Sequence, residues 1–149
     1  MKNMIASFLS IIMLFMLLCI TPVYYWSIID YAKTSTVLLA STRNVIDEVI
    51  DTRQLTDVTL EEFTLDLATV SGYYEADIVR KKMYINPGAA PGKEYISYFV
   101  VDDNRVYDSG DKIQITVRPV ADSYFEAISK TFMGLSLGSS KFTLVGRVR

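Results

Sequence analysis

The chain has 149 residues, of which half are hydrophobic, and its 15 basic and 17 acidic residues give a net charge of −2. The sequence has no lysine- and arginine-rich block, which argues against nucleic acid as a partner. It has no histidine and a single cysteine, Cys19, so the commonest general base is missing and neither an intramolecular disulfide nor a zinc cluster can form. The length suits one small domain with an anchor.

Residues 1–29 are predicted to form a transmembrane helix. No charged residue occurs from Asn3 to Ile29, and this run exceeds the roughly 20 residues that a helix needs to cross a bilayer. The apolar region of a secretory signal peptide is shorter and is followed by a small-residue cleavage site, which the segment Tyr24 to Ser27 does not offer. We therefore expect an uncleaved anchor.

Flanking residues indicate how this anchor is oriented. Lys2 on the N-terminal side favours a cytoplasmic N-terminus and an extracytoplasmic C-terminal domain. The aromatic cluster Tyr24 to Trp26 fits the outer membrane interface. Pro22 predicts a kink near Cys19–Pro22, because proline removes a helical hydrogen bond; alternatively, the helix ends there and a second one begins.

Residues 30–53 are predicted to continue the same helix in amphipathic form. Apolar and small residues recur at spacings of three and four, and no glycine or proline interrupts the stretch from Val23 to Arg53. The positions on this face are Ile28, Tyr31, Ala32, Ser35, Leu38, Leu39, Thr42, Val45, Ile46, Val49 and Ile50, and the opposite, polar face includes Thr34 and Ser41. A helix of this total length, about 75 Å at 1.5 Å per residue, is too long for the rest of the chain to bury. Part of it must lie in lipid or against other subunits.

Residues 54–149 are predicted to form an α+β extracytoplasmic domain. It opens with a short helix, for which Thr59 and Glu62 have capping-box spacing. Phe63, Leu67 and Val70 form its apolar side, and Ser71-Gly72 ends it.

The period then changes to two, which is typical of strands. Four strands are expected, at Tyr73–Ile85, Tyr95–Val101, Lys112–Val117 and Lys141–Val148, with a possible return at Arg105–Tyr107. In the first strand, Val79, Met83 and Ile85 are predicted on one face, with Arg80 and Lys82 on the other. The basic run Arg80 to Lys82 is read as a solvated strand face or loop and not as a phosphate site. In the third, Ile113, Ile115 and Val117 are predicted to point inward. Clustered strands with flanking helices favour an antiparallel sheet, with the soluble half of the long helix packed on one face.

The remaining segments are read as turns and one further helix. Turns are expected at 86–92, 102–105, 108–111 and 134–140. Ser123 and Glu126 have capping-box spacing and precede a helix that has Phe125, Ile128 and Phe132 on one face.

No combination of residues indicates catalysis or a cofactor. Asp102 to Asn104 and Asp108 to Asp111 are rich in oxygen ligands, but both lack the spacing of a calcium loop and are read as ordinary turns. The serines have no histidine and no G-x-S-x-G elbow. Lys130 and Lys141 lie near serines, but nothing more specific supports a Ser–Lys arrangement. We predict that the protein is not an enzyme and binds no metal or cofactor.

The C-terminal stretch carries a family resemblance. "GDKIQITVRPVADSYFEAISKTFMGLSLGSSKFTLVGRVR", Gly110 to Arg149, combines a Gly-Asp turn, an alternating strand, an apolar segment with a Leu-Gly loop and a final strand. Together with the anchor, this layout resembles type IV pilin-like proteins, most of all the TadE/TadG-like pilins and pseudopilins of tight-adherence systems. The glutamate that such pilins carry early in the apolar helix is absent, since the first acidic residue here is Asp30.

The resemblance implies a structural subunit that is held in the membrane before assembly and then forms a homo-oligomeric helical filament at the cell surface. Its helices would pack through a predicted assembly interface consisting of Phe8, Ile11, Ile12, Phe15, Leu18, Ile20, Pro22 and Tyr24. Other pilus or secretion components are possible partners. The alternatives are a single-pass, non-polymerising component of a secretion or conjugation apparatus, whose helix contacts only lipid, and an anchored sensor domain.

Overall fold

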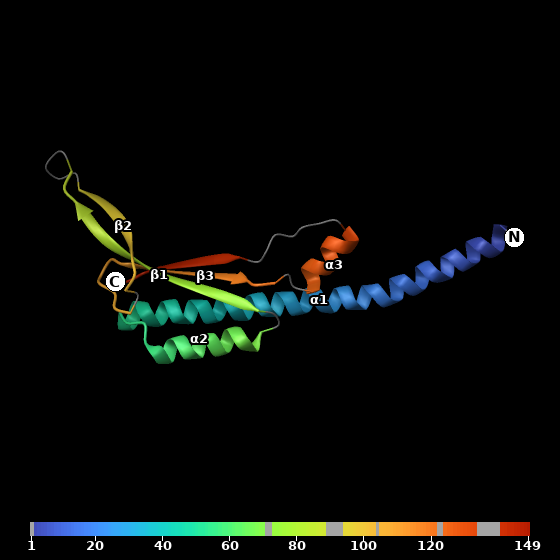
Figure 1. Ribbon diagram of the computed structural model, residues 1–149, viewed down its shortest axis with the longest axis horizontal. Coiled ribbons are helices and arrows are strands. Elements are labelled where there is room, and N and C mark those ends of the chain that lie inside the picture. The colour runs from blue at the N-terminus through green and yellow to red at the C-terminus, as the bar shows by residue number, and fades with distance from the viewer. Residues whose placement is uncertain (1, 71–72, 89–93, 104, 122–123, 134–140) are drawn as a thin grey trace.

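The computed structural model describes residues 2–70, 73–88, 94–103, 105–121, 124–133 and 141–149. Its elements are α1 (Lys2–Thr52), α2 (Asp57–Thr69), β1 (Tyr74–Asn86), β2 (Tyr95–Val101), β3 (Lys112–Pro119), α3 (Tyr124–Met133) and β4 (Phe142–Arg147). The predicted α+β class with an antiparallel sheet is confirmed. Figure 1 shows the sheet and α2 beside the C-terminal half of α1, while the N-terminal half projects alone beyond α3.

Helix α1 is one continuous helix of 51 residues, so the alternative of two helices that meet at Pro22 is wrong. The ribbon bends within its N-terminal half (Figure 1), as expected where Pro22 removes a backbone hydrogen bond. The helix ends at Thr52. The next residue, Arg53, donates its amide to the Val49 carbonyl at 2.9 Å and has a left-handed φ of 59°. A left-handed residue is a common way to end a helix.

Helix α2 begins two residues before the predicted capping box. Its N-cap is Thr56, whose hydroxyl accepts a hydrogen bond from the amide of Thr59. Thr59 is buried, and its own hydroxyl donates to Glu48 Oε1 at 2.8 Å. Thr59 therefore joins α2 to α1 instead of capping α2. Phe63 and Leu67 are buried as predicted, and Val70, the C-cap residue, also packs against the core.

The sheet has the strand order β2-β1-β3-β4, with every neighbouring pair antiparallel. Strand β1 is long enough to pair with β3 through Tyr74–Lys81 and with β2 through Arg80–Asn86. The predicted return at Arg105–Tyr107 is not a strand of this sheet; Val106 forms an isolated bridge to Gln54.

The core lies between one face of the sheet and the second half of α1, with α2 packed on the helix. The prediction for β3 is confirmed, since Ile113, Ile115 and Val117 are fully buried. The buried residues of α1 are Thr34, Leu38, Ser41, Thr42, Val45, Ile46 and Val49. The chain's own domain thus covers the predicted apolar face from Leu38 onward except for Leu39, which is 46 % exposed. Thr34 and Ser41, which were predicted on the opposite face, are buried instead.

The predicted grouping of β1 residues into two faces holds, but the face that carries Arg80, which was expected to be solvated, is the buried one. Arg80 lies on the buried face and is only 6 % exposed, whereas Ile85 is 58 % exposed. On the buried face Arg80 follows Ala76 and Ile78, which pair with the core strand β3. In α3, Ser123 and the side chains of Phe125, Ile128 and Phe132 lie outside the described residues, so the predicted cap and apolar face are not assessed.

Candidate functional site

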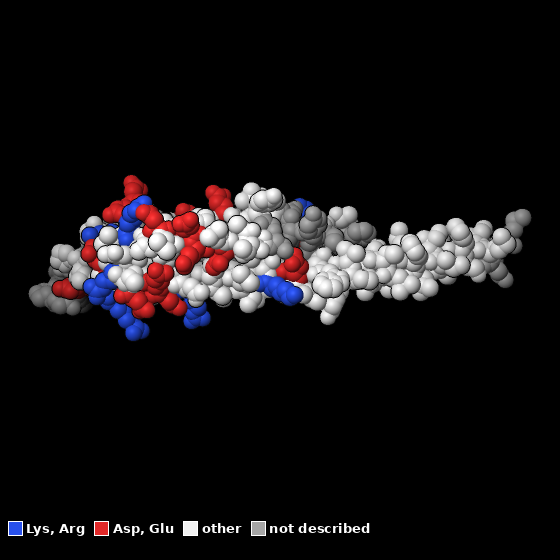
Figure 2. All heavy atoms as spheres, turned by 90° about the horizontal axis from the view of Figure 1, so that it is seen from below, with Lys and Arg blue, Asp and Glu red and all other residues white. Residues whose placement is uncertain are grey.

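The candidate assembly surface is the apolar N-terminal half of α1. Its large apolar side chains from Met4 to Leu18 are 41–81 % exposed, and the helix is long and apolar enough to cross a membrane. Figure 2 shows this half as an uncharged rod on the visible face, with acidic and basic side chains gathered on the domain. Exposing this contiguous apolar surface to water costs a free energy of roughly 25 cal/mol per Å² of apolar area.

All eight residues of the predicted assembly interface lie on this helix. Phe8, Ile11, Ile12, Phe15, Leu18 and Pro22 are exposed, and Ile20 and Tyr24 are half-buried. The structure does not set them apart, because Leu9, Met13, Leu14 and Leu17 are equally exposed on the other sides. Helical periodicity alone cannot choose among faces where nearly every position is apolar.

Two hydroxyls in this half form hydrogen bonds within the helix. Ser10 donates its hydroxyl hydrogen to the Ala6 carbonyl at 3.0 Å, and Thr21 does the same to the Leu17 carbonyl at 2.6 Å. Hydroxyls bonded back to the preceding turn expose no unpaired donor to an apolar environment. The half-helix is therefore suited to lipid or to other apolar helices.

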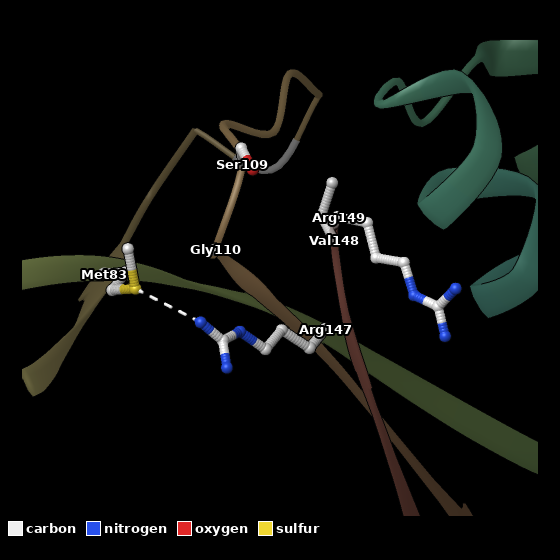
Figure 3. A pocket seen from close by; sticks show the side chains of 6 residues that line it. All are labelled: Met83, Ser109, Gly110, Arg147, Val148 and Arg149. Carbon is white, nitrogen blue, oxygen red and sulfur yellow. Dashed lines mark hydrogen bonds between the residues drawn. The ribbon is translucent and has the colours of Figure 1, made fainter.

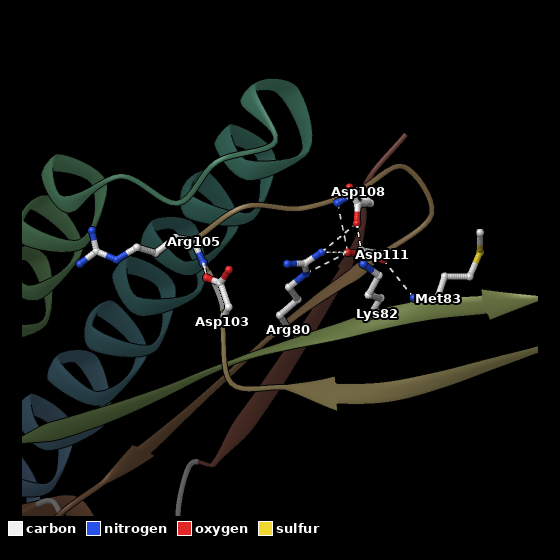
Figure 4. Close-up of polar contacts among 7 residues, drawn as sticks. All are labelled: Arg80, Lys82, Met83, Asp103, Arg105, Asp108 and Asp111. Carbon is white, nitrogen blue, oxygen red and sulfur yellow. Dashed lines mark hydrogen bonds and ion pairs between the residues drawn. The ribbon is translucent and has the colours of Figure 1, made fainter.

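A buried ion pair joins the sheet to the turn that precedes β3 (Figure 4). Arg80 places Nε and Nη2 at 2.9 and 2.6 Å from Asp111 Oδ2, and the Asp111 side chain is 1 % exposed. The backbone amides of Met83 and Asp108 also donate to this carboxylate, at 3.0 and 3.1 Å. Asp111 thus accepts hydrogen bonds both from β1 and from its own turn. These hydrogen bonds hold the turn against the strand.

Hydrogen bonds lower the pKa of Asp111. Burial acts to raise the pKa of this carboxyl, but hydrogen bonds from the Met83 amide and from Arg80 outweigh burial and hold the pKa below its ordinary value of 3.8. Asp108, more exposed, binds Arg80 at 3.2 Å and Lys82 at 3.0 Å. The carboxylates of the turn at 108–111 therefore bind cationic side chains of β1. The turn has a structural role, which is to connect β1 with the start of β3.

Tyr107 packs beneath this cluster, with its ring centroid 5.5 Å from the Arg80 guanidinium carbon. The side chain is 2 % exposed, and within the described residues its hydroxyl has no hydrogen-bond partner. Burial raises the pKa of Tyr107 from 10.0 to about 12, because a phenolate would lose its hydration.

We expect Tyr107→Phe to leave the free energy of unfolding unchanged or to raise it by up to about 1 kcal/mol at neutral pH, since an unpaired buried hydroxyl is removed. The wild-type chain should lose stability as the pH rises from 10 toward 12, because the unfolded tyrosine ionises first. The variant should lose less over this window. Urea unfolding in detergent at pH 7, 10 and 11.5 measures both effects, and a clear loss at pH 7 would show that the hydroxyl has a partner.

Two shallow hollows lie at the end of the domain away from the N-terminus. One, of about 530 Å³, is lined by Met83, Ser109, Gly110, Arg147, Val148 and Arg149 (Figure 3). The other, of about 440 Å³, is lined by Asp47, Ile50, Asp51, Arg53, Arg147 and Arg149. The linings contain no nucleophile beside a base, and among the described residues no group of three acidic, cysteine or histidine side chains is placed to hold a metal.

In the turn at Asp102 to Asn104, considered above for calcium, a carboxylate forms a hydrogen bond within the turn. Asp103 accepts a hydrogen bond from the Arg105 amide at 3.1 Å (Figure 4), an ordinary turn interaction; Asn104 lies outside the described residues.

Comparisons with protein-family models, with curated proteins and with solved structures found no match.

Proposed function

We propose that this chain is a structural subunit of a pilus-like filament, anchored in the membrane before assembly, with its domain extracytoplasmic. The observation that carries the proposal is that α1 is one helix with two environments. Its second half is part of the domain core, whereas its first half presents large apolar side chains that the chain's own domain leaves uncovered. Such a helix requires lipid before assembly and other apolar helices afterwards.

A second observation favours assembly over a plain anchor. Val37 and Leu39 lie past Asp30 and Lys33, the charged residues that follow the apolar run, and are 44 and 46 % exposed on the two flanks of the buried Leu38. The apolar surface therefore continues beyond the stretch that lipid would cover. Neighbouring α1 helices on both flanks would cover it, whereas a non-polymerising anchor would leave this second part in water.

Substitution within the apolar half tests this proposal. We expect Phe15→Lys to reduce surface filaments more than tenfold, because a lysine at this depth costs roughly 2.5–3.5 kcal/mol. The rest of the apolar run should still retain the chain in the membrane, which carbonate extraction measures. The matched control is Val58→Lys on α2, where the wild-type side chain is 65 % exposed on the domain, and filaments should persist.

Electron microscopy of cells that produce each chain gives the readout. Filaments that survive Phe15→Lys in normal number would contradict assembly through this half of α1. Wild-type chains that remain monomeric in membranes under assembly conditions would instead support the non-polymerising component.

A further inference from the structure

Strands β2 and β4 form the two open edges of the sheet. Among the described strands, β2 pairs only with β1, and β4 pairs only with β3. An open edge presents unpaired amide and carbonyl groups that can bind another strand. Charges, prolines or bulges usually protect such edges, but β2 has the sequence YISYFVV and contains no charge, proline or glycine.

The β1–β2 hairpin also extends past the rest of the sheet. Beyond Lys81, β1 has no pairing with β3 and continues with β2 alone as a two-stranded ribbon (Figure 1). Exposed apolar side chains cover this ribbon: Ile85 at 58 %, Tyr95 at 60 %, Ile96 at 52 %, Phe99 at 55 % and Val100 at 65 %. Two-stranded ribbons are marginally stable in water, so a further strand on β2 would add both hydrogen bonds and apolar burial.

Strand direction identifies the occupant as β4 of a second copy. Because each neighbouring pair is antiparallel, β2 runs parallel to β3 and antiparallel to β4. A copy that is shifted sideways, without reversal of its long axis, therefore presents β4 to β2 in antiparallel orientation, and both α1 helices enter the same membrane. Antiparallel pairing of β2 with another β2 needs a two-fold axis perpendicular to the sheet, which would reverse the second α1.

We propose that β2 of one subunit pairs with β4 of the next to form a continuous sheet along the assembly. This inference rests on the proposed function, because it requires copies that lie side by side. In β2 the residues Ser97, Phe99 and Val101 share the face toward α1, and in β4 this face holds Phe142, Leu144 and Gly146. Matching faces and complete pairing of β4 select one register: Ile96 with Arg147, Ser97 with Gly146, Tyr98 with Val145, Phe99 with Leu144, Val100 with Thr143 and Val101 with Phe142.

This register makes the contact head-to-tail and open-ended. Strand β4 lies level with Ala76–Lys81 of β1 through β3, whereas β2 lies level with Arg80–Asn86. Each copy is therefore offset by about four residues, or about 13 Å along the strands at 3.3 Å per residue. A repeated offset of this kind generates a helical stack and not a closed ring.

Disulfide trapping tests the register in the full chain. In a Cys19→Ser background, the pair Val100→Cys and Thr143→Cys should form a ladder of disulfide-linked oligomers when assembled material is oxidised with copper phenanthroline. Both wild-type side chains are exposed, so the fold should tolerate the changes, and circular dichroism checks this. The matched control, Val100→Cys with Val145→Cys, is two residues out of register and should yield about tenfold less product, because a disulfide needs Cβ atoms roughly 4 Å apart.

The outcomes separate this inference from the proposed function. Filaments that form normally but give no ladder would overturn the strand pairing and leave helix-mediated assembly standing. Dimers from Val100→Cys alone would show β2–β2 contact and would also overturn it. Chains that neither assemble nor cross-link would overturn both proposals.

Discussion

Replacing Asp111 with alanine is expected to lower the free energy of unfolding by about 3–5 kcal/mol, the range for removal of one partner from a buried ion pair. Arg80 is 6 % exposed, and without Asp111 its guanidinium would stay buried with only the partly exposed Asp108 as a counter-charge. The amides of Met83 and Asp108 would lose the carboxylate that they bind. Urea unfolding of the full chain in detergent, followed by circular dichroism, measures the change.

The matched control is Asp108→Ala. Asp108 binds the same arginine, but its side chain is 62 % exposed, so its removal should cost no more than about 1 kcal/mol. Equal losses for the two variants would show that burial does not set the strength of the Asp111 contact.

Acid should act on the wild-type chain through the same carboxylate. The pKa of Asp111 is lowered in the folded state, so its contribution to stability is present above the unfolded pKa of about 3.9 and is lost as the pH falls through the folded value. The wild-type chain should therefore lose more stability below pH 4 than Asp111→Ala does.

Replacing Gly146 with valine is expected to lower the free energy of unfolding by about 1–3 kcal/mol, the usual cost of overpacking a core. A Cβ at this position would meet the Ile46 side chain at less than contact distance, and it would lie 3.1 Å from Ile50 Cδ1 and 3.3 Å from Ile113 Cγ2. Residue 146 is where β4 crosses α1, so the substitution should push the helix away from the sheet.

Thermal unfolding measures this effect, and Thr143→Val on the same strand is the matched control. Thr143 is exposed, and valine has a high strand propensity, so this variant should retain wild-type stability. A Gly146→Val chain with an unchanged midpoint would show that α1 shifts freely on the sheet.

Local sequence patterns were sufficient for the elements whose residues interact with near neighbours. The uncharged run from Asn3 to Ile29 and the unbroken spacing to Arg53 predicted one long helix. The alternation in β3 predicted its buried face, because a strand with one face in the core repeats every two residues. The predicted assembly interface remains a prediction, because a monomer contains no second helix to select a face.

Tertiary structure decided the features that depend on residues distant in sequence. Arg80 was assigned to the solvent face because a lone arginine is costly to bury, yet Asp111, 31 positions later, supplies the charge and hydrogen bonds that make burial possible. Thr59 fits a cap by spacing, but Glu48 on α1 engages its hydroxyl and Thr56 caps α2 instead. The strand order, with β1 between β2 and β3, likewise follows from long-range pairing. The sequence by itself determined which segments are helix and strand and which part of the long helix is uncharged, whereas the contacts between segments determined which side of each is buried.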